Sequence, residues 1–396
     1  MQSLLPSNVY SPRPDPSFVK RKSEGLRATI FSDSGVDRNG VGSYYSDLIE
    51  HLSGKVDMAE LICAGNGENK GFASRWRLPL PGDYTQRIWM PNARRVETNL
   101  RIRAPNVVVS VTPGPFGLLG LYYAHRMQVP FVCGFHTCLE TLSCMYWTSV
   151  ARKVNQRFLE YVNQRFFENA VAVVTNSRDM MQIASDMGGK NVQLVGTPVN
   201  PLLLQHSPVL PEKKIKRILY VGRLAPEKNI GAILQAAKDI PEMEFLLAGD
   251  GPLRKSVRYA SKETENLNFL GWVPRYRLKS TIEQADLVVL PSQLESFGTV
   301  ALETLACRRN VLVSRNCGIT SWPSLAKALF VMRTGENLTE ALLRVSKTNY
   351  SVRRQKAEEG YSAVALWNNA TIDKWLSIFS MASAKLPRNR QMAETQ

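Results

Sequence analysis

Short apolar runs alternate with stretches of helical periodicity from residue 27 onward. The series begins with RATIFSD, passes through the amphipathic GVGSYYSDLIEHL, and continues with the strand candidates MAELICA, NVVVSV, PFVCGFHT and AVAVVTNS. This alternation predicts βαβ units built on a parallel sheet. The strand candidates end in small or polar residues, and the carboxyl ends of parallel strands form the edge at which open α/β sheets bind ligands.

The alternation stops at residues 195–216, where VGTPVNPLLLQHSPVLPEKKIK combines several prolines with a charged run. Such composition is typical of an interdomain linker. The alternation then resumes with the strand candidates RILYVGRL, MEFLLAGDG, LNFLGWV, ADLVVLPS and NVLVSRN, which are separated by helical stretches. The chain is therefore predicted to be an α/β protein with two doubly wound, Rossmann-like domains.

Composition and periodicity divide the chain into segments. The first residues are rich in Pro, Ser and mixed charge, which indicates a loose arm. Near the other end, AEEGYSAVALWNNATIDKWLSIFSMASA is interpreted as a helix with Trp367 and Trp375 as large anchors. We expect a flexible arm at 1–24, a first domain at 25–200, a linker at 201–214, a second domain at 215–360, a C-terminal helix at 361–384 and a disordered tail at 385–396.

The composition favours a cytoplasmic globular protein. The chain has 396 residues, of which 44% are hydrophobic and 21% charged, enough for two domains of ordinary size. Its apolar runs are too short or too interrupted to span a bilayer, and its first residues lack the apolar core of a signal peptide. The six cysteines are irregularly spaced, without a Cys-x-x-Cys pair, so reduced thiols are favoured over a structural zinc site.

The formal net charge of +16 predicts attraction to polyanions or to an anionic membrane. The sequence contains no helix-turn-helix, RNP or zinc-finger signature, so nucleic acid is not an expected partner. Basic residues cluster at 94–103 and at 152–165, and the second cluster has apolar residues at helical spacing. That stretch is either a basic amphipathic helix at a membrane surface or a packed helix with a solvated basic face.

The run VVLPSQLESFGTVALETLAC at 288–307 carries the most informative candidate chemistry. It predicts a buried strand at 288–290, a loop with Glu295, Phe297 and Gly298, and then a helix that contains Glu303. A glycine at this junction lets the backbone approach a ligand, and the helix start suits a phosphate. Glu303, one turn into the helix, is placed to accept two ribose hydroxyls, and Glu295 to face a sugar beyond the phosphates. Two solvated carboxylates on a surface loop are the alternative.

A second run, LYVGRLAPEKNIGAILQAAK, places two cations after a strand. Arg223 and Lys228 follow Gly222, close to a predicted helix start. Two such cations neutralise a diphosphate, Arg through its planar fork and Lys as a point charge. A solvated basic loop is the alternative interpretation.

The two runs resemble the signatures of retaining GT-B glycosyltransferases of family 4, also called glycosyltransferase group 1. The first run is similar to the family's Glu-seven-residues-Glu signature, and the second to its G-R-x-x-x-E-K-N motif. The resemblance covers about residues 27–380. It implies two domains facing across a cleft, the first on the acceptor side and the second binding the nucleotide sugar. It also implies a C-terminal helix that crosses back onto the first domain.

The resemblance implies roles for several residues. Arg223 and Lys228 are expected to hold the donor phosphates, Glu295 the sugar and Glu303 the ribose. Gly40, in an Asn39-Gly40 pair that replaces the family's Gly-Gly, is expected near the phosphates. The implied donor contacts also include Val273 near the base, His136 near the sugar, and Phe297, Gly298 and Thr299 in the signature loop. The Gly40 turn lacks the third glycine of a dinucleotide fingerprint, which disfavours an NAD enzyme.

The sequence therefore predicts a retaining glycosyltransferase. It would move a sugar from a nucleotide-diphosphate donor to a hydroxyl of a lipid or glycan, in the cytoplasm or peripherally on a membrane. His136, Glu295, Arg223 and Lys228 are the expected catalytic residues. No cofactor and no metal are expected, because the cations and backbone amides meet the phosphate charge and no Asp-x-Asp motif follows a strand. A sugar-nucleotide epimerase of the same fold and a catalytically silent lipid- or polyanion-binding protein remain alternatives.

Overall fold

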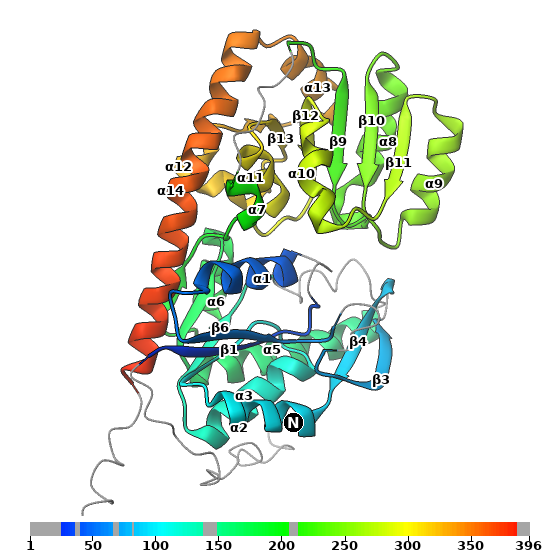
Figure 1. Cartoon of the computed structure of the whole chain (residues 1–396). Coiled ribbons are helices and arrows are strands. Elements are labelled where there is room, and N and C mark those ends of the chain that lie inside the picture. Colours follow the sequence, from blue (N-terminus) through cyan, green and yellow to red (C-terminus); the bar gives the residue numbers. More distant parts are fainter. Residues whose placement is uncertain are drawn as a thin grey trace, which may run out of the picture.

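The computed structural model describes residues 25–35, 40–65, 71–80, 83–137, 149–205 and 213–385. Two six-stranded parallel sheets, each packed with helices, form the two halves of the chain (Figure 1). This arrangement confirms the predicted α/β fold class. The expected arm at 1–24, Asn39 and all but the first residue of the expected tail lie outside the described residues.

The first sheet has the strand order β2-β1-β5-β6-β7-β8. Its interior strands β5 and β6 are buried along their whole length, as expected for continuous apolar runs in a sheet covered on both faces. The strands are β1 (Arg27–Phe31), β2 (Met58–Ile62), β5 (Val107–Ser110), β6 (Phe131–Gly134), β7 (Ala170–Thr175) and β8 (Val192–Leu194). The helices of this half include α1 (Gly40–Leu52), α2 (Ala93–Arg103), α3 (Pro115–Met127), α5 (Ser149–Asn169) and α6 (Arg178–Asp186).

An antiparallel hairpin that the sequence analysis did not predict projects from this first half. Its strands are β3 (Ala73–Leu80) and β4 (Asp83–Pro91), which pair with each other and, among the residues that the structure describes, with no further strand. At its base, the amide of Asn92 donates to the carbonyl of Phe72 at 2.8 Å, and Ala73 is buried in the core of the first half. The hairpin is therefore anchored at its base and extends away from the sheet (Figure 1).

The second sheet has the order β11-β10-β9-β12-β13-β14, so the chain reverses its direction of winding between β9 and β12. In open α/β sheets this switch point is where ligands bind. The strands are β9 (Arg217–Val221), β10 (Glu244–Ala248), β11 (Leu267–Gly271), β12 (Leu287–Leu290), β13 (Asn310–Val313) and β14 (Phe330–Val331). The helices include α8 (Ile230–Asp239), α9 (Arg254–Glu263), α10 (Arg275–Glu283), α11 (Thr299–Ala306), α12 (Pro323–Ala326) and α13 (Leu338–Ser346), with the 3₁₀ turns η1 (Pro226–Lys228) and η2 (Gly318–Ser321).

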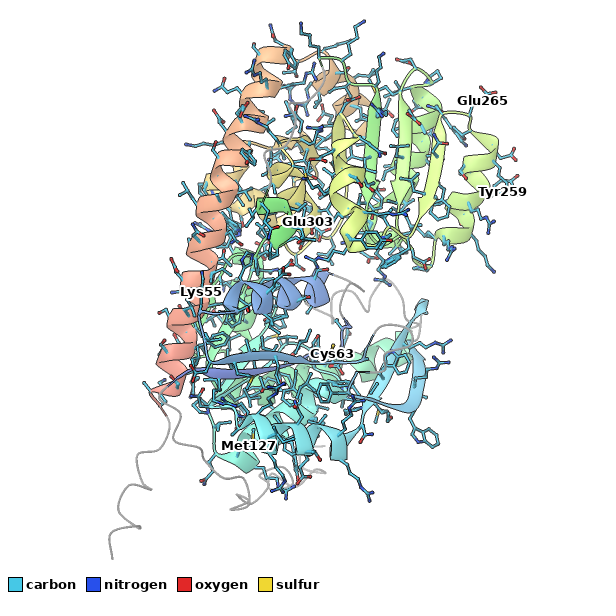
Figure 2. All side chains as sticks on the ribbon, viewed as in Figure 1. Lys55, Cys63, Met127, Tyr259, Glu265 and Glu303 are labelled. Atoms are coloured by element: carbon cyan, nitrogen blue, oxygen red, sulfur yellow. The ribbon has the colours of Figure 1, made fainter. Side chains whose placement is uncertain are left out.

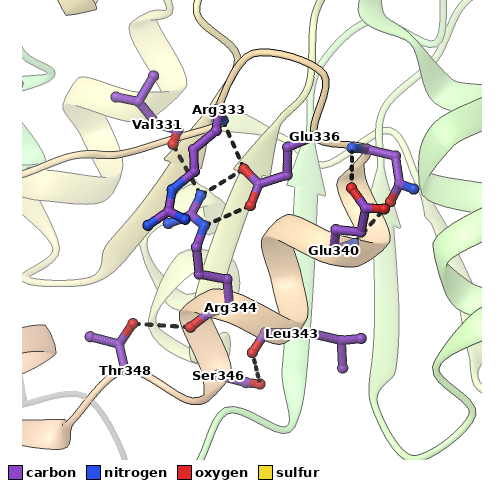
Figure 3. Close-up of polar contacts among 9 residues, drawn as sticks. Val331, Arg333, Glu336, Glu340, Leu343, Arg344, Ser346 and Thr348 are labelled. Atoms are coloured by element: carbon purple, nitrogen blue, oxygen red, sulfur yellow. Dashed lines mark hydrogen bonds and ion pairs between the residues drawn. The ribbon is translucent and has the colours of Figure 1, made fainter.

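The turn that leads into α13 is fixed by one carboxylate (Figure 3). Glu336 accepts two hydrogen bonds from the Arg344 guanidinium, at 2.7 and 2.8 Å, and one from the amide of Arg333. The Arg344 guanidinium accordingly lowers the pKa of Glu336. Asn337 and Glu340 cap the helix reciprocally. These contacts hold the end of the second sheet without involving the candidate site.

One long helix, α14 (Tyr350–Ser383), runs along both halves of the chain (Figure 1). Its middle part packs closely on α11, because a Cβ on Gly360 would lie 2.6 Å from a methyl carbon of Leu305. Trp367 lies in the core of the second half, while Trp375 is fully buried in the core of the first. The two tryptophans thus anchor the same helix to different halves.

Side chains also join the two halves directly. Arg275 on α10 forms an ion pair with Asp47 on α1. The indole of Trp322 donates to the carbonyl of Asn176 at 3.2 Å. Near the connection between the halves, which contains α7 (Pro201–Leu204), His51 donates to the carbonyl of Val199 at 2.7 Å.

Among the described residues, no helix has the length and apolar character needed to cross a membrane.

Candidate functional site

The loop between β12 and α11 has a backbone that requires glycine. Gly298, the N-cap of α11, has a φ of 96°, and an added Cβ would lie 2.5 Å from Sγ of Cys317. Helix α11 begins at Thr299, and Gly298 has no side chain that could cap it. The backbone amides of the first turn of a helix favour an anionic ligand. The preceding Glu295 forms a backbone bridge with Cys317. The sequence thus places Glu295 and the helix start at the carboxyl end of β12, next to the switch point.

Lys228 and Glu295, two of the predicted catalytic residues, are in direct contact. Nζ of Lys228 lies 2.7 Å from Oε2 of Glu295, and each side chain is 19% exposed. Oγ of Ser292 donates to the same carboxylate oxygen at 3.3 Å. Burial alone would lower the pKa of Lys228, but the Glu295 carboxylate raises it above its ordinary value, so Lys228 is cationic at neutral pH. The sequence analysis assigned these residues to phosphate and sugar but did not foresee their ion pair.

Arg223 is held beside this pair by a buried carboxylate. Its Nη1 lies 3.1 Å from Oε1 of Glu227, whose side chain is 3% exposed. The backbone carbonyl of Glu227 accepts hydrogen bonds from the amides of Gln293 and Leu294, at 2.8 and 3.3 Å. The turn after β9 is therefore tied to the loop after β12. Arg223, Lys228 and Glu295 consequently share the carboxyl edge of neighbouring strands at the switch point.

Glu303 lies on α11, between the two halves of the chain, where Figure 2 labels it. It belongs to a buried cluster with Asp47 and Arg275. It is 4% exposed, and burial raises its pKa to about 7 despite the opposing effect of the Arg275 cation. Burial likewise raises the pKa of Asp47 to about 7, where Arg275 opposes the shift and Glu303 adds to it. The sequence analysis selected Glu303 but missed Asp47 and Arg275, which carry no motif and are 228 residues apart.

His136 lies two residues after the end of β6 and belongs to an aromatic cluster in the first half. Its Nε2 lies 2.6 Å from the hydroxyl of Tyr45, and its ring centroid lies 4.6 Å from that of Tyr44. The other ring nitrogen, Nδ1, is buried and has no hydrogen-bond partner among the described residues. Burial lowers the pKa of His136 to about 3, so the imidazole is neutral at pH 7. The sequence analysis did not identify Tyr45.

The remaining predicted residues differ in what they can offer a ligand. Gly40 begins α1, and a Cβ on it would lie 3.7 Å from Oγ1 of Thr299, so the two halves approach each other here. Phe297 is 2% exposed and stacks on Trp367 with a centroid distance of 5.9 Å, which leaves its backbone as the group available to a donor. Val273 follows β11 and is partly buried against the core of the second half.

A hollow of about 360 Å³ lies farther along the same edge, after β13 and β14. It is not the site that the motifs predict. The two places are neighbours, because Cys317, in the segment between the lining residues Arg315 and Thr320, forms a backbone bridge with Glu295. Its lining consists of Arg315, Thr320, Val331, Met332 and Arg333. Within the described parts of the chain, no group of three or more His, Cys, Asp or Glu side chains is arranged to hold a metal ion.

Two family models match consecutive parts of the chain. One, described as "Glycosyl transferases group 1", matches residues 205–362. The other, described as "Glycosyltransferase Family 4", matches residues 38–201. Together the two matches include all ten predicted site residues.

Curated relatives include the sulfoquinovosyl transferase SQD2 of Arabidopsis thaliana. It is 22% identical over 330 residues, which are 79% of this chain and 64% of that protein. A GDP-mannose-dependent alpha-(1-6)-phosphatidylinositol dimannoside mannosyltransferase of Mycobacterium tuberculosis is 23% identical over 252 residues, 58% of this chain and 63% of the relative. The chain thus spans less than two thirds of the length of either relative.

Solved structures with the same fold cover nearly the whole chain. A sucrose-phosphate synthase from Thermosynechococcus elongatus aligns with a TM-score of 0.70 at 18% identity, over 91% of this chain and 99% of its own. The Anabaena protein HepE in complex with UDP-glucose aligns with a TM-score of 0.63 at 17% identity, over 91% and 99%. At these identities the alignments establish the GT-B fold.

Proposed function

Since this chain belongs to the family 4 (group 1) glycosyltransferases, we propose that it transfers a sugar, with retention, from a nucleotide-diphosphate donor to an acceptor hydroxyl. The observation that supports the proposal is the grouping of Arg223, Lys228 and Glu295 at the switch point of the second sheet. Two cations and a carboxylate there, with a helix start alongside, match the charge and the hydroxyls of a nucleotide sugar.

The donor phosphates would bind between the cations and the start of α11. When the bond between the anomeric carbon and the phosphate oxygen breaks, the leaving diphosphate gains negative charge. Arg223 and Lys228 would then stabilise the transition state more than the bound donor. Because these side chains supply positive charge at the phosphates, we propose that the transfer requires no divalent ion and no cofactor.

Retention would follow from attack on the face that the diphosphate leaves. The acceptor oxygen forms a bond to the anomeric carbon while the old carbon–oxygen bond breaks, and the acceptor proton passes to the departing phosphate oxygen. Glu295 would bind sugar hydroxyls, and its contact with Lys228 would hold both side chains ready. His136, neutral at pH 7, would offer an uncharged imidazole to the sugar or the acceptor.

Glu303 would bind the ribose, and the first half would face the acceptor. We propose a lipid or glycan as the acceptor class, because a phosphatidylinositol dimannoside mannosyltransferase is among the relatives. Closing the two halves around the donor would exclude water and limit hydrolysis. A lipid acceptor is compatible with peripheral attachment to a membrane from the cytoplasmic side.

Product analysis tests the proposal. The full chain is incubated with a panel of nucleotide sugars, with and without lipid and glycan acceptors, and the products are identified by mass and by the anomeric coupling constant. Acceptor-dependent transfer with an unchanged anomer supports the proposal. Release of an epimerised sugar without any acceptor would indicate a sugar-nucleotide epimerase, whereas no turnover with any donor would favour a catalytically silent binding protein.

A further inference from the structure

The β3–β4 hairpin has one apolar and one basic face. Its register pairs Arg77 with Trp89 and Leu78 with Ile88. Successive side chains of a strand point to opposite faces, so Leu78 and Ile88 share one face while Arg77 and Trp89 share the other. Trp76 lies two residues before Leu78, where the ladder between Ala73 and Arg77 is irregular, and its side chain is exposed like that of Leu78.

The apolar face is strongly exposed. Trp76 is 79% exposed, Leu78 60% and Met90 42%. Met90 lies two residues beyond Ile88 and therefore on the same face. Scattered exposed apolar residues are ordinary, but Trp76, Leu78 and Met90 are grouped with the half-buried Ile88 on one projecting hairpin. Such a grouping marks a contact with a partner or a membrane.

On the opposite face, Trp89 attaches the hairpin to the core of the first half. The guanidinium of Arg77 lies over the ring of Trp89, 5.3 Å from its centroid. Trp89 is partly buried and packs against the core of the first half, as does Phe72 at the base of β3. Trp89 therefore supports the hairpin with Arg77 over its ring, whereas Trp76 and Leu78 are exposed and lie outside that core.

Exposed cations lie on the opposite face of the hairpin and on the helix beside it. Arg77 and Arg87 lie on the hairpin, and Arg94 and Arg95 lie on the first turn of α2, which begins two residues after β4 ends. The nearby carboxylate of Glu97 is paired with Arg101 at 2.7 Å. An exposed tryptophan, further exposed apolar side chains and arginines close to them are the combination that suits the interface of an anionic bilayer.

We propose that the β3–β4 hairpin docks this protein on an anionic lipid bilayer. Trp76, Leu78, Ile88 and Met90 enter the interfacial region, while the arginines contact lipid phosphates. In Figure 1 the hairpin lies on the opposite side of the first half from α14. Docking through the hairpin therefore leaves α14, and the contacts it makes with both halves, away from the lipid.

Vesicle binding by the full chain tests this proposal. Vesicles of phosphatidylcholine with phosphatidylglycerol should retain the protein in co-sedimentation, and vesicles of pure phosphatidylcholine should retain much less. The double variant Trp76→Ser/Leu78→Ser and the double variant Arg77→Gln/Arg87→Gln should each bind anionic vesicles on the order of tenfold more weakly. Added salt should weaken the wild type more than the variant without the two arginines.

A matched control comes from α5, the helix of the basic stretch at 152–165. Phe158 on α5 is 52% exposed, so Phe158→Ser removes a comparable apolar group from another surface. If Phe158→Ser abolishes vesicle binding and Trp76→Ser/Leu78→Ser does not, the proposal is wrong. Quenching of tryptophan fluorescence by brominated lipid should also fall when Trp76 is replaced, and unchanged quenching would contradict the proposal.

Two further measurements separate the remaining outcomes. Sedimentation velocity without lipid shows whether the hairpin joins two copies of the chain; a dimer that Trp76→Ser/Leu78→Ser dissociates would overturn the membrane assignment. Docking on a bilayer rests on the proposed function with a lipid acceptor, but vesicle binding is measured without a sugar donor. Calorimetry with UDP on the same samples shows whether nucleotide binding survives, so docking and the proposed function can fail independently.

Discussion

The hydroxyl of Tyr45 lies 2.6 Å from Nε2 of His136 in the buried interior of the first half. Burial lowers the pKa of His136 to about 3 and raises that of Tyr45 well above its ordinary value, so both groups are neutral at pH 7. A tyrosine that donates to Nε2 leaves the ring proton on Nδ1, the nitrogen with no partner among the described residues.

Tyr45→Phe tests this assignment of the His136 proton. Without the hydroxyl, the ring should lose its preference for the Nδ1–H tautomer, and the free energy of unfolding should fall by about 1 kcal/mol. Nitrogen-15 spectra of histidine-labelled protein report the tautomer directly, and the chain has only four histidines. If the nitrogen-15 chemical shift of Nε2 is the same in the wild type and the variant, the hydrogen bond from Tyr45 is not what fixes the tautomer of His136.

Glu303 should make stability depend on pH. Between its ordinary pKa and about 7, the folded chain keeps the Glu303 proton while the unfolded chain has released it. The free energy of unfolding therefore falls as pH rises through this window. Because Glu303→Gln does not titrate, its stability relative to the wild type should increase by up to about 3 kcal/mol from about pH 4 to about pH 8.

Urea unfolding at several pH values measures this difference. Glu263→Gln, at the exposed end of α9, provides the control for loss of a carboxylate that water already solvates. A Glu303→Gln variant whose stability runs parallel to that of the wild type at every pH would show that Glu303 is not desolvated.

Arg275 should be required for the contact between the halves. Replacing it with Ala leaves Asp47 and Glu303 buried without their common cation, which should cost about 3 kcal/mol of unfolding free energy near neutral pH. Arg277→Ala removes an exposed arginine from the same helix and should cost less than about 0.5 kcal/mol. Equal effects of the two variants in thermal unfolding would argue against the interdomain ion pair.

Arg223 should act mainly on the transition state. Arg223→Ala is expected to lower kcat by about 100- to 1,000-fold while the KM for the donor rises only a few-fold, because the leaving diphosphate needs the cation most. Arg258→Ala, an exposed arginine on α9, is the matched control. Steady-state kinetics that show full turnover in the Arg223 variant would exclude the leaving-group role.

The sequence predicted what depends on local pattern. The buried runs before Arg223 and Glu295 became neighbouring strands, since continuous apolar segments between helices have few other ways to be buried. The contact between Lys228 and Glu295 was not predicted, because it depends on the register between two loops. Phe297 remains a predicted site residue, but the packing of its side chain on Trp367 of α14 was not predicted, because the two residues are far apart in the sequence.

Long-range contacts and the β3–β4 hairpin do not follow from local sequence pattern. Asp47 and Arg275 lie on ordinary amphipathic helices, and only the packing of the two halves brings them together. The hairpin at 73–91 mixes arginine, tryptophan and proline, so neither of its strands gives a clean alternation of apolar and polar residues. Its apolar face became visible only with the strand register.

Calorimetric titration of the folded full chain with nucleoside diphosphates and nucleotide sugars tests the proposed nucleotide-sugar site most directly. At least one nucleotide should bind saturably. Its affinity should fall by about tenfold or more in Glu303→Ala, which removes hydrogen bonds to the ribose, and should be unchanged in Arg258→Ala. A folded protein that binds none of these ligands, or binds them equally well without Glu303, would contradict the proposed nucleotide-sugar site.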